Sequence, residues 1–195
     1  MVTELRTALR PAIVLLLLFA GLTGLAYPAL ITGVAQLALP YQANGSMVSD
    51  KGNIIGSELI AQGFASPRYF QPRPSAAGKG YDATNSGATN LAPGDKGLRD
   101  AIAARVAQAR KNSLTNDDVP ADLVTSSASG LDPDLSPEAA FWQVAHIAKA
   151  RNLPEGAVRA LVTANISYPL LGLIGDPHVN VLALNRQLDA MSAKH

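Results

Sequence analysis

Apolar residues are distributed very unevenly along the chain. Residues 12–39 are almost continuously apolar, and Gln36 is the only strongly polar side chain among them. A helix needs about 20 apolar residues to cross roughly 30 Å of hydrocarbon, so this stretch predicts one transmembrane helix at about residues 12–36. From residue 40 onward the pattern becomes that of a soluble domain. The sequence therefore predicts two parts: residues 1–39, a short N-terminus and the span, and residues 40–195, one folded domain.

A cleaved secretory signal peptide is the alternative interpretation of the apolar stretch. Arg6 and Arg10 would form its basic start, but its apolar core should be about 7–15 residues long, and this stretch continues further. The same arginines predict the orientation, because the next cation is Lys51, beyond the span. Positive flanks stay on the cytoplasmic side. We therefore expect a single-pass protein of the inner membrane with a cytoplasmic N-terminus and an extracytoplasmic domain.

Small residues recur at four-residue spacing inside the predicted span, as Ala20/Gly24 and Ala29/Gly33. Such pairs let a second helix approach closely, which makes these four residues candidate contacts with another subunit. Alternatively they face lipid, since Gly and Ala are common in membrane helices. Pro28 lacks a backbone donor and predicts a kink in the same helix.

The second half of the domain carries helical periodicity and clear helix-start signals. Asp95 can cap a helix, Ser136 followed by Pro and Glu is a strong N-terminus, and Pro154 opens a further helix. The predicted helices span residues 95–111, 136–151, 154–168 and 180–190. Their core-facing positions are expected to be Leu98, Ile102, Val106, Ala109, Ala140, Phe141, Val144, Ile147, Val158, Leu161, Val162, Ile166, Val181, Leu184 and Leu188.

The first half, residues 41–93, is rich in loops. Three prolines within residues 67–74 forbid a helix and disfavour a central strand. Long irregular stretches are usually functional or disordered, and aromatics argue for order; those present are Phe64, Tyr69, Phe70 and Tyr81. A short helix at 57–62 and a short strand and turn at 119–126 complete the prediction. The expected fold class is a single N-terminal transmembrane helix followed by one mostly helical α+β domain with a long ordered Pro/Gly-rich loop region.

Charge and composition exclude several classes of function. The formal net charge is +1, so no nucleic-acid partner is indicated. The chain has 0 Cys, which excludes a disulfide scaffold, a thiolate metal site and a cysteine nucleophile. His146, His178 and His195 do not share a metal-ligand spacing. His146 falls with Gln143 and Lys149 on the polar side of its predicted helix, so we expect it to be solvated.

The sequence contains no recognisable catalytic motif. Residues 78–80 contain a Gly-Lys pair but lack the other positions of a phosphate-binding loop, and neither a Gly-x-Ser-x-Gly elbow nor an Asp-Lys-Thr-Gly phosphorylation loop occurs. Asp132 and Asp134, on either side of a proline, suggest either Ca²⁺ ligation or turn capping. Because Ca²⁺ takes six to eight oxygens, a turn leading into Ser136 is the better interpretation.

Several long irregular strings resemble the C subunit of the Kdp-type potassium-transporting P-type ATPase, the KdpC family. The order and spacing of these strings agree with the family, and the resemblance covers essentially the whole chain. Asp134 and His146 depart from it, since the family usually has His and often Arg there, which weakens any role for these two side chains. The matching strings are GSELI (56–60), FASPRYFQPRPSA (64–76), YDA (81–83), SGATNL (86–91), PADLVTSSASGLDPDLSP (120–137) and GDPHVNVLALN (175–185).

The resemblance implies a subunit without catalysis of its own in a four-part membrane complex. Its partners would be a channel-like potassium-conducting subunit, an ATP-hydrolysing pump subunit and a small single-span subunit. Two roles are attached to the family: assembly and stabilisation of the complex, and a catalytic chaperone that raises the ATP affinity of the pump subunit. ATP is thus implied by the family alone. An extracytoplasmic domain cannot touch cytoplasmic ATP, so such an effect would be a coupling free energy passed through the membrane part.

Within the domain, Arg68, Tyr69, Phe70 and Arg73 form a rigid, charged and aromatic segment of the kind that interface anchors favour. The alternative is that the two aromatics belong to the domain's own core while the arginines are solvated. Asp82 is the preferred acid for concentrating cations at an entrance by its field.

A membrane-anchored extracytoplasmic enzyme, such as a hydrolase using Ser86 or Ser129, is the alternative function. No His or acid accompanies either serine in a recognisable motif.

Overall fold

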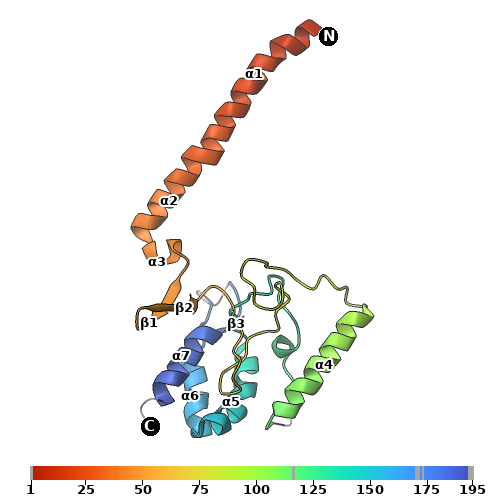
Figure 1. The fold of residues 1–195 in the computed structure, drawn as a ribbon, viewed down its shortest axis with the longest axis vertical. Coiled ribbons are helices and arrows are strands. Elements are labelled where there is room, and N and C mark those ends of the chain that lie inside the picture. The colour runs from red at the N-terminus through yellow and green to blue at the C-terminus, as the bar shows by residue number, and fades with distance from the viewer. Residues whose placement is uncertain (1, 116, 170–171, 173, 193–195) are drawn as a thin grey trace. The chain divides into compact units, whose positions relative to one another are not determined.

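A computed structural model describes residues 2–115, 117–169, 172 and 174–192. The chain divides into two units, residues 1–47 and 48–195. Each unit has its own architecture (Figure 1).

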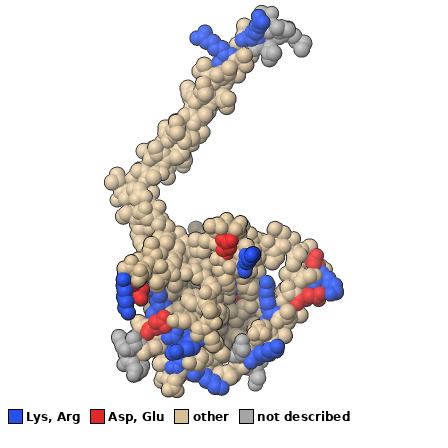
Figure 2. Space-filling model, viewed as in Figure 1, with Lys and Arg blue, Asp and Glu red and all other residues tan. Residues whose placement is uncertain are grey.

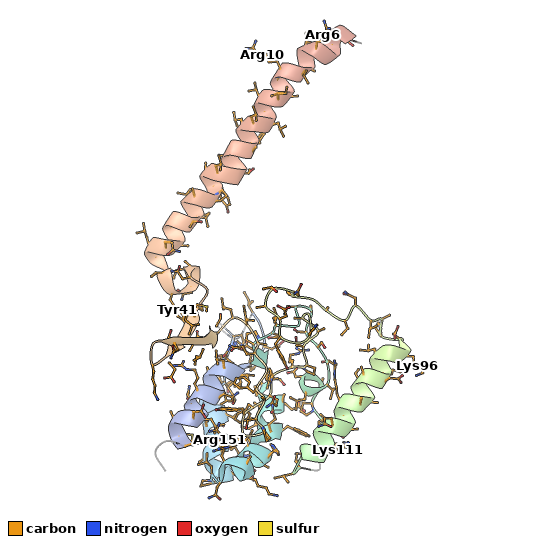
Figure 3. The ribbon with its side chains drawn as sticks, in the orientation of Figure 1. Arg6, Arg10, Tyr41, Lys96, Lys111 and Arg151 are labelled. Atoms are coloured by element: carbon orange, nitrogen blue, oxygen red, sulfur yellow. The ribbon has the colours of Figure 1, made fainter. Side chains whose placement is uncertain are left out.

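The first unit is one long apolar helical stretch followed by a short helix. It consists of α1 (Val2–Gly21), the π-helical turn η1 (Leu22–Ala26), α2 (Tyr27–Ala38) and α3 (Pro40–Ala43). Its segment Arg6–Ala38 is the one helix in the described part of the chain that is long and apolar enough to cross a membrane. This confirms the predicted apolar helix. Arg6 and Arg10 lie toward its N-terminal end, and the helix beyond them is uncharged (Figures 2 and 3).

A π-helical turn precedes Pro28, while the kink predicted there stays a prediction. Tyr27 donates its N–H to the carbonyl of Leu22, five residues back. Pro28 lies directly after this bond, near the start of α2. The proline's missing N–H is therefore accommodated where the hydrogen-bond register changes.

The second unit begins with a β-hairpin that the sequence did not predict. Strands β1 (Met47–Asp50) and β2 (Asn53–Ser57) pair as a two-stranded sheet. Lys51 and Gly52 between them both have positive φ, the conformation of a two-residue hairpin turn. The helix predicted at 57–62 is wrong, because β2 continues to Ser57 and a turn follows.

Three helices form the centre of the second unit. They are α5 (Pro137–Arg151), α6 (Glu155–Ala164) and α7 (Val181–Ser192), with α6 packed against both others. A short antiparallel pair joins β3 (Asp134–Leu135) to β4 (Val179–Asn180). The core they enclose contains Phe70, Leu135, Val144, Ile147, Val158, Val162, Val179, Leu184 and Leu188.

The helix-start signals located the helices well. Ser136 Oγ accepts the N–H of Ala139 at the start of α5. Asp95 caps α4 (Lys96–Asn112) by accepting the N–H of Gly97. The third helix ends earlier than expected, because Asn165 turns its side-chain amide back onto the carbonyl of Leu161.

Of the short strand and turn predicted at 119–126, the strand is wrong and the turn is present. This segment forms the 3₁₀ turn η2 (Ala121–Leu123). Thr125 returns both its N–H and its hydroxyl to the carbonyl of Ala121, so the backbone closes on itself instead of pairing with another strand.

Candidate functional site: the Pro-rich segment and its cavity

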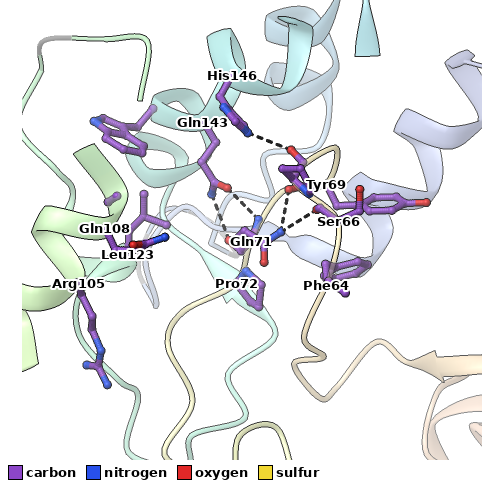
Figure 4. Close-up of a pocket in the computed structure, with 14 residues that line it drawn as sticks. Phe64, Ser66, Tyr69, Gln71, Pro72, Arg105, Gln108, Leu123, Gln143 and His146 are labelled. Atoms are coloured by element: carbon purple, nitrogen blue, oxygen red, sulfur yellow. Dashed lines mark hydrogen bonds between the residues drawn. The ribbon is translucent and has the colours of Figure 1, made fainter. Parts of the chain in front are cut away.

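Residues 64–76, hereafter the Pro-rich segment, cross the second unit without helix or strand. Two buried amides hold the middle of the segment. Asn185 accepts the N–H of Phe70 and donates to its carbonyl, both at 2.9 Å. Gln143 makes the same reciprocal pair with Gln71, at 2.8 and 3.1 Å (Figure 4). A backbone that its prolines exclude from a sheet is thus paired by side chains from α7 and α5.

A buried arginine holds the start of the segment. The side chain of Arg151 is only 4% exposed and lies over the ring of Tyr69, 4.6 Å from the centroid. It donates to the carbonyl of Arg68 at 2.8 Å and to Asp189 at 2.7 Å. Tyr69 completes the cluster by donating its hydroxyl to the same Asp189. Figure 3 marks Arg151 at the end of α5.

Arg73 holds the far end of the segment. Its guanidinium lies 3.4 Å from Asp122 and 3.5 Å from Asp132 and donates to Thr125. Tyr81 donates its hydroxyl to the carbonyl of Arg73. The alternative in which Arg73 is solvated is therefore wrong, because its half-buried guanidinium pairs with acids of its own unit. The two acids lie in the string 120–137, but nothing in their spacing indicates that they meet residue 73.

A cavity of about 440 Å³ opens beside the Pro-rich segment, between it and helices α4 and α5 (Figure 4). None of the described residues that line it is an Asp or Glu. Its basic side chains are already engaged: Arg105 donates to the carbonyl of Val124, and His146 is hydrogen-bonded to that of Pro67. The lining thus offers an apolar surface with satisfied polar groups, which suits binding more than proton transfer. Its apolar walls include Phe64, Pro72, Leu123 and Trp142.

Two residues of the expected polar face behave differently from the prediction. Gln143 is buried, because its amide pairs with the backbone of Gln71. His146 is half-buried rather than fully solvated, and it bonds to the Pro-rich segment. The spacing of polar and apolar residues along a helix cannot show that a polar side chain is buried, when its hydrogen-bond partner is a backbone group far away in the sequence.

The candidate contact residues of the segment fall into different environments. Phe70 is fully buried in the core of its own unit, as the core alternative predicted. Tyr69 is half-buried against Arg151, whereas Arg68 keeps an exposed side chain. Of this set, Arg68 is the residue whose side chain is most available to a partner.

Asp82 is half-buried at the surface and organises its own loop. It accepts bonds from the N–H and the hydroxyl of Thr84 and from the amide of Asn85. The bond from Asn85 and those from Thr84 lower the pKa of Asp82 below its ordinary value, so the carboxylate stays charged at the surface.

The candidate residues of the span are also exposed. Ala20, Gly24, Ala29 and Gly33 all lie on the surface of the helical stretch. A Cβ added at either glycine would meet nothing within 4 Å. Their role as helix contacts stays a prediction.

The carboxylates around Pro133 form a turn, as the sequence indicated. Asp132 accepts the N–H of Asp134, and Asp134 in turn accepts a bond from Asn180 across the β3–β4 pair. Burial raises the pKa of Asp134 above its ordinary value, and the bond from Asn180 opposes that rise. Among the residues that the structure describes, no group of three possible ligands could hold a metal ion.

The two serines proposed as nucleophiles in the hydrolase alternative are both hydrogen-bonded to backbone groups. Ser86 donates to the carbonyl of Ser129, and Ser129 Oγ accepts the N–H of Leu131. His146 and His178 are bonded instead to the carbonyls of Pro67 and Asp176. This arrangement does not favour a serine nucleophile.

An apolar helix long enough to span a bilayer, followed by a small domain built around an irregular segment, is the architecture of a membrane-associated protein with one candidate span. The model of the family described as "K+-transporting ATPase, c chain", KdpC, matches residues 9–190. The chain belongs to this family.

Curated relatives agree over almost the full length. The Potassium-transporting ATPase KdpC subunit of Allorhizobium ampelinum is 57% identical over 186 residues, covering 95% of this chain and 97% of the relative. That of Rhodospirillum rubrum is 54% identical, covering 95% and 96%. That of Bradyrhizobium diazoefficiens is 50% identical, covering 95% and 98%.

Proposed function

We propose that this chain is a non-catalytic accessory subunit of a high-affinity, ATP-driven potassium uptake complex. It assembles and stabilises the complex with a potassium-conducting subunit, an ATP-hydrolysing subunit and a small single-span subunit. The supporting observation is that the family match runs through the apolar helix and the folded domain together, over residues 9–190. Because the family model matches the apolar helix and the folded domain together, we infer that both parts serve the same membrane complex.

The proposed placement is a single pass through the inner membrane, with the N-terminus in the cytoplasm and the domain outside. Arg6 and Arg10, at the N-terminal end of the apolar helix, support this orientation. Because the chain has 0 Cys, one introduced at the exposed position Lys111 gives a clean test. Lys111→Cys is expected to react with an impermeant thiol reagent in intact cells, whereas labelling only after permeabilisation contradicts the orientation.

Any effect on the ATP affinity of the pump subunit would then be indirect. With the domain outside, the coupling must pass through the span, where Ala20, Gly24, Ala29 and Gly33 are the proposed helix contacts. Arg68 and Asp82 are the proposed contacts of the domain. Tight binding of an ATP analogue by the purified chain alone would contradict this part of the proposal.

Recovery of partners tests the function itself. The tagged full-length chain is purified from gently solubilised membranes of cells that make all four subunits, and the recovered proteins are identified by mass. We expect the other three subunits in fixed proportion. Gly24→Leu should lower their recovery, while Leu25→Phe, beside it on the exposed helix, is the matched control. A chain recovered alone would contradict the proposal.

A further inference from the structure

Exposed apolar side chains gather on two segments of the second unit. Such side chains scattered singly are normal, but a cluster of them marks an interaction surface. We call this set the apolar patch: Ile54 (65% exposed), Leu59 (59%), Tyr168 (72%) and Ile174 (81%).

Hydrogen bonds bring the two segments together. The bridge between Ser167 and His178, with bonds of 2.8 and 3.0 Å, closes the loop that carries Tyr168 and Ile174. Two residues beyond that bridge, Asn180 donates its side-chain amide to the carbonyl of Glu58 at 2.9 Å. The loop and the end of β2 are therefore neighbours in the fold.

This surface also lies close in the chain to the apolar helix. α2 ends at Ala38 and β1 begins at Met47. Nine connecting steps of at most about 3.6 Å limit their separation to roughly 30 Å. If the helix is anchored in a bilayer, the hairpin that carries Ile54 cannot be far from the lipid headgroups.

The composition of the patch fits a lipid surface. Residues 160–175 contain no Asp, Glu, Lys or Arg, so this segment can enter the boundary region without taking a charge out of water. On the other segment the half-buried Glu58 precedes Leu59, and its carboxylate must remain in headgroup water. Protruding aliphatic side chains with a tyrosine suit the boundary between headgroups and acyl chains, where tyrosine is enriched. Protein interfaces draw their energy instead from Trp, Tyr and Arg seated in pockets. The charged Lys51 and Asp176 are exposed beside the patch and can remain in headgroup water.

We propose that the apolar patch inserts shallowly into the outer face of the bilayer, so that the domain is held against the membrane at a second point besides its helix. This inference rests on the anchored topology proposed above. Insertion restricts the domain's motion and thereby presents one fixed face to the other subunits.

Fluorescence quenching by brominated lipids tests the insertion. The chain has a single tryptophan, Trp142, so Trp142→Phe gives a background into which Ile174→Trp is introduced. Leu114→Trp is the matched control, because Leu114 is an exposed leucine (52%) outside the patch. Both full-length chains are placed in nanodiscs of phosphatidylethanolamine and phosphatidylglycerol containing brominated phosphatidylcholine.

We expect the Ile174→Trp chain to emit at shorter wavelength and to lose intensity to lipids brominated near the headgroup more than to those brominated near the chain end. The control should lose none. Equal behaviour of the two chains would overturn the inference. A second result would also overturn the inference. The tryptophan at position 174 would be protected from quenching by aqueous iodide only in the assembled complex, and brominated lipid would not quench its fluorescence. That result would assign the patch to a protein partner. Recovery of the complex, measured on the same chains, tests the proposed function separately.

Discussion

The buried amide of Asn185 is the most demanding contact of the Pro-rich segment. The residue is 1% exposed and satisfies both backbone groups of Phe70, which is itself fully buried. Replacing Asn185 by alanine removes both partners at once. Both residues are buried, so the N–H and the carbonyl of Phe70 lose their partners at a site away from bulk water.

The size of the effect follows from these two groups. An unsatisfied buried donor or acceptor costs about 1–3 kcal/mol, so the pair predicts a loss of about 2–6 kcal/mol. A fall of 1 kcal/mol lowers the melting temperature by about 2–4 °C in a domain of this size. A central value of about 4 kcal/mol therefore predicts a fall of roughly 8–16 °C.

The assay is thermal unfolding of the full-length chain in mild detergent, followed by the fluorescence of Trp142. Gln187→Ala is the matched control, because its amide also lies on α7 but bonds to Asn165 at an exposed site. We expect the control to lower the melting temperature by less than about 2 °C. If Asn185→Ala and Gln187→Ala melt alike, the argument that two buried amides hold the Pro-rich segment is refuted.

Three further predictions concern other fixed points of the domain. Gly130 has φ +66°, and an added Cβ would lie 2.6 Å from the backbone N of Ala77. Gly130→Ala should therefore lower the free energy of unfolding in urea by at least about 2 kcal/mol. If the variant unfolds at the same urea concentration as the wild type, the clash is contradicted. Arg73→Ala leaves two half-buried carboxylates without their cation, so it should lower the free energy of unfolding by about 1–3 kcal/mol, with Arg68→Ala as the exposed control; equal stability of the two variants would refute the ion-pair role. Burial raises the pKa of Asp134, so its contribution to stability is full below the unfolded pKa of about 3.9 and is lost as the pH rises through the higher folded value. Asp134→Asn removes that loss, so the wild type should lose stability relative to this variant as the pH rises above the unfolded pKa of about 3.9. Stability curves of the two chains that run parallel over pH would contradict the assignment.

The helices were predictable because their signals are local. Ser136 before Pro137, and Asp95 before α4, act on N–H groups two or three residues away. The apolar helix was predictable for a related reason, since a bilayer demands a long run of apolar residues regardless of what the rest of the chain does.

The strands and the contacts of the Pro-rich segment depend on distant partners. β3 pairs with β4 more than 40 residues later, and two-residue strands leave no alternating pattern. Gln143 was assigned to a polar face because its partner, the backbone of Gln71, is 72 residues away. The sequence left Arg73 open between an interface contact and a solvated side chain, because its acids are 49 and 59 residues distant. Irregular segments lack periodicity, so only the assembled fold reveals which side chains satisfy them.

The central claim is that the chain supports a potassium-transporting ATPase without catalysing the reaction itself. The most direct measurement is potassium-stimulated ATP hydrolysis by membranes from cells that make the other three subunits, with and without this chain. The account predicts that activity requires the chain and that the chain alone hydrolyses no ATP. Full potassium-stimulated activity in its absence would contradict the account.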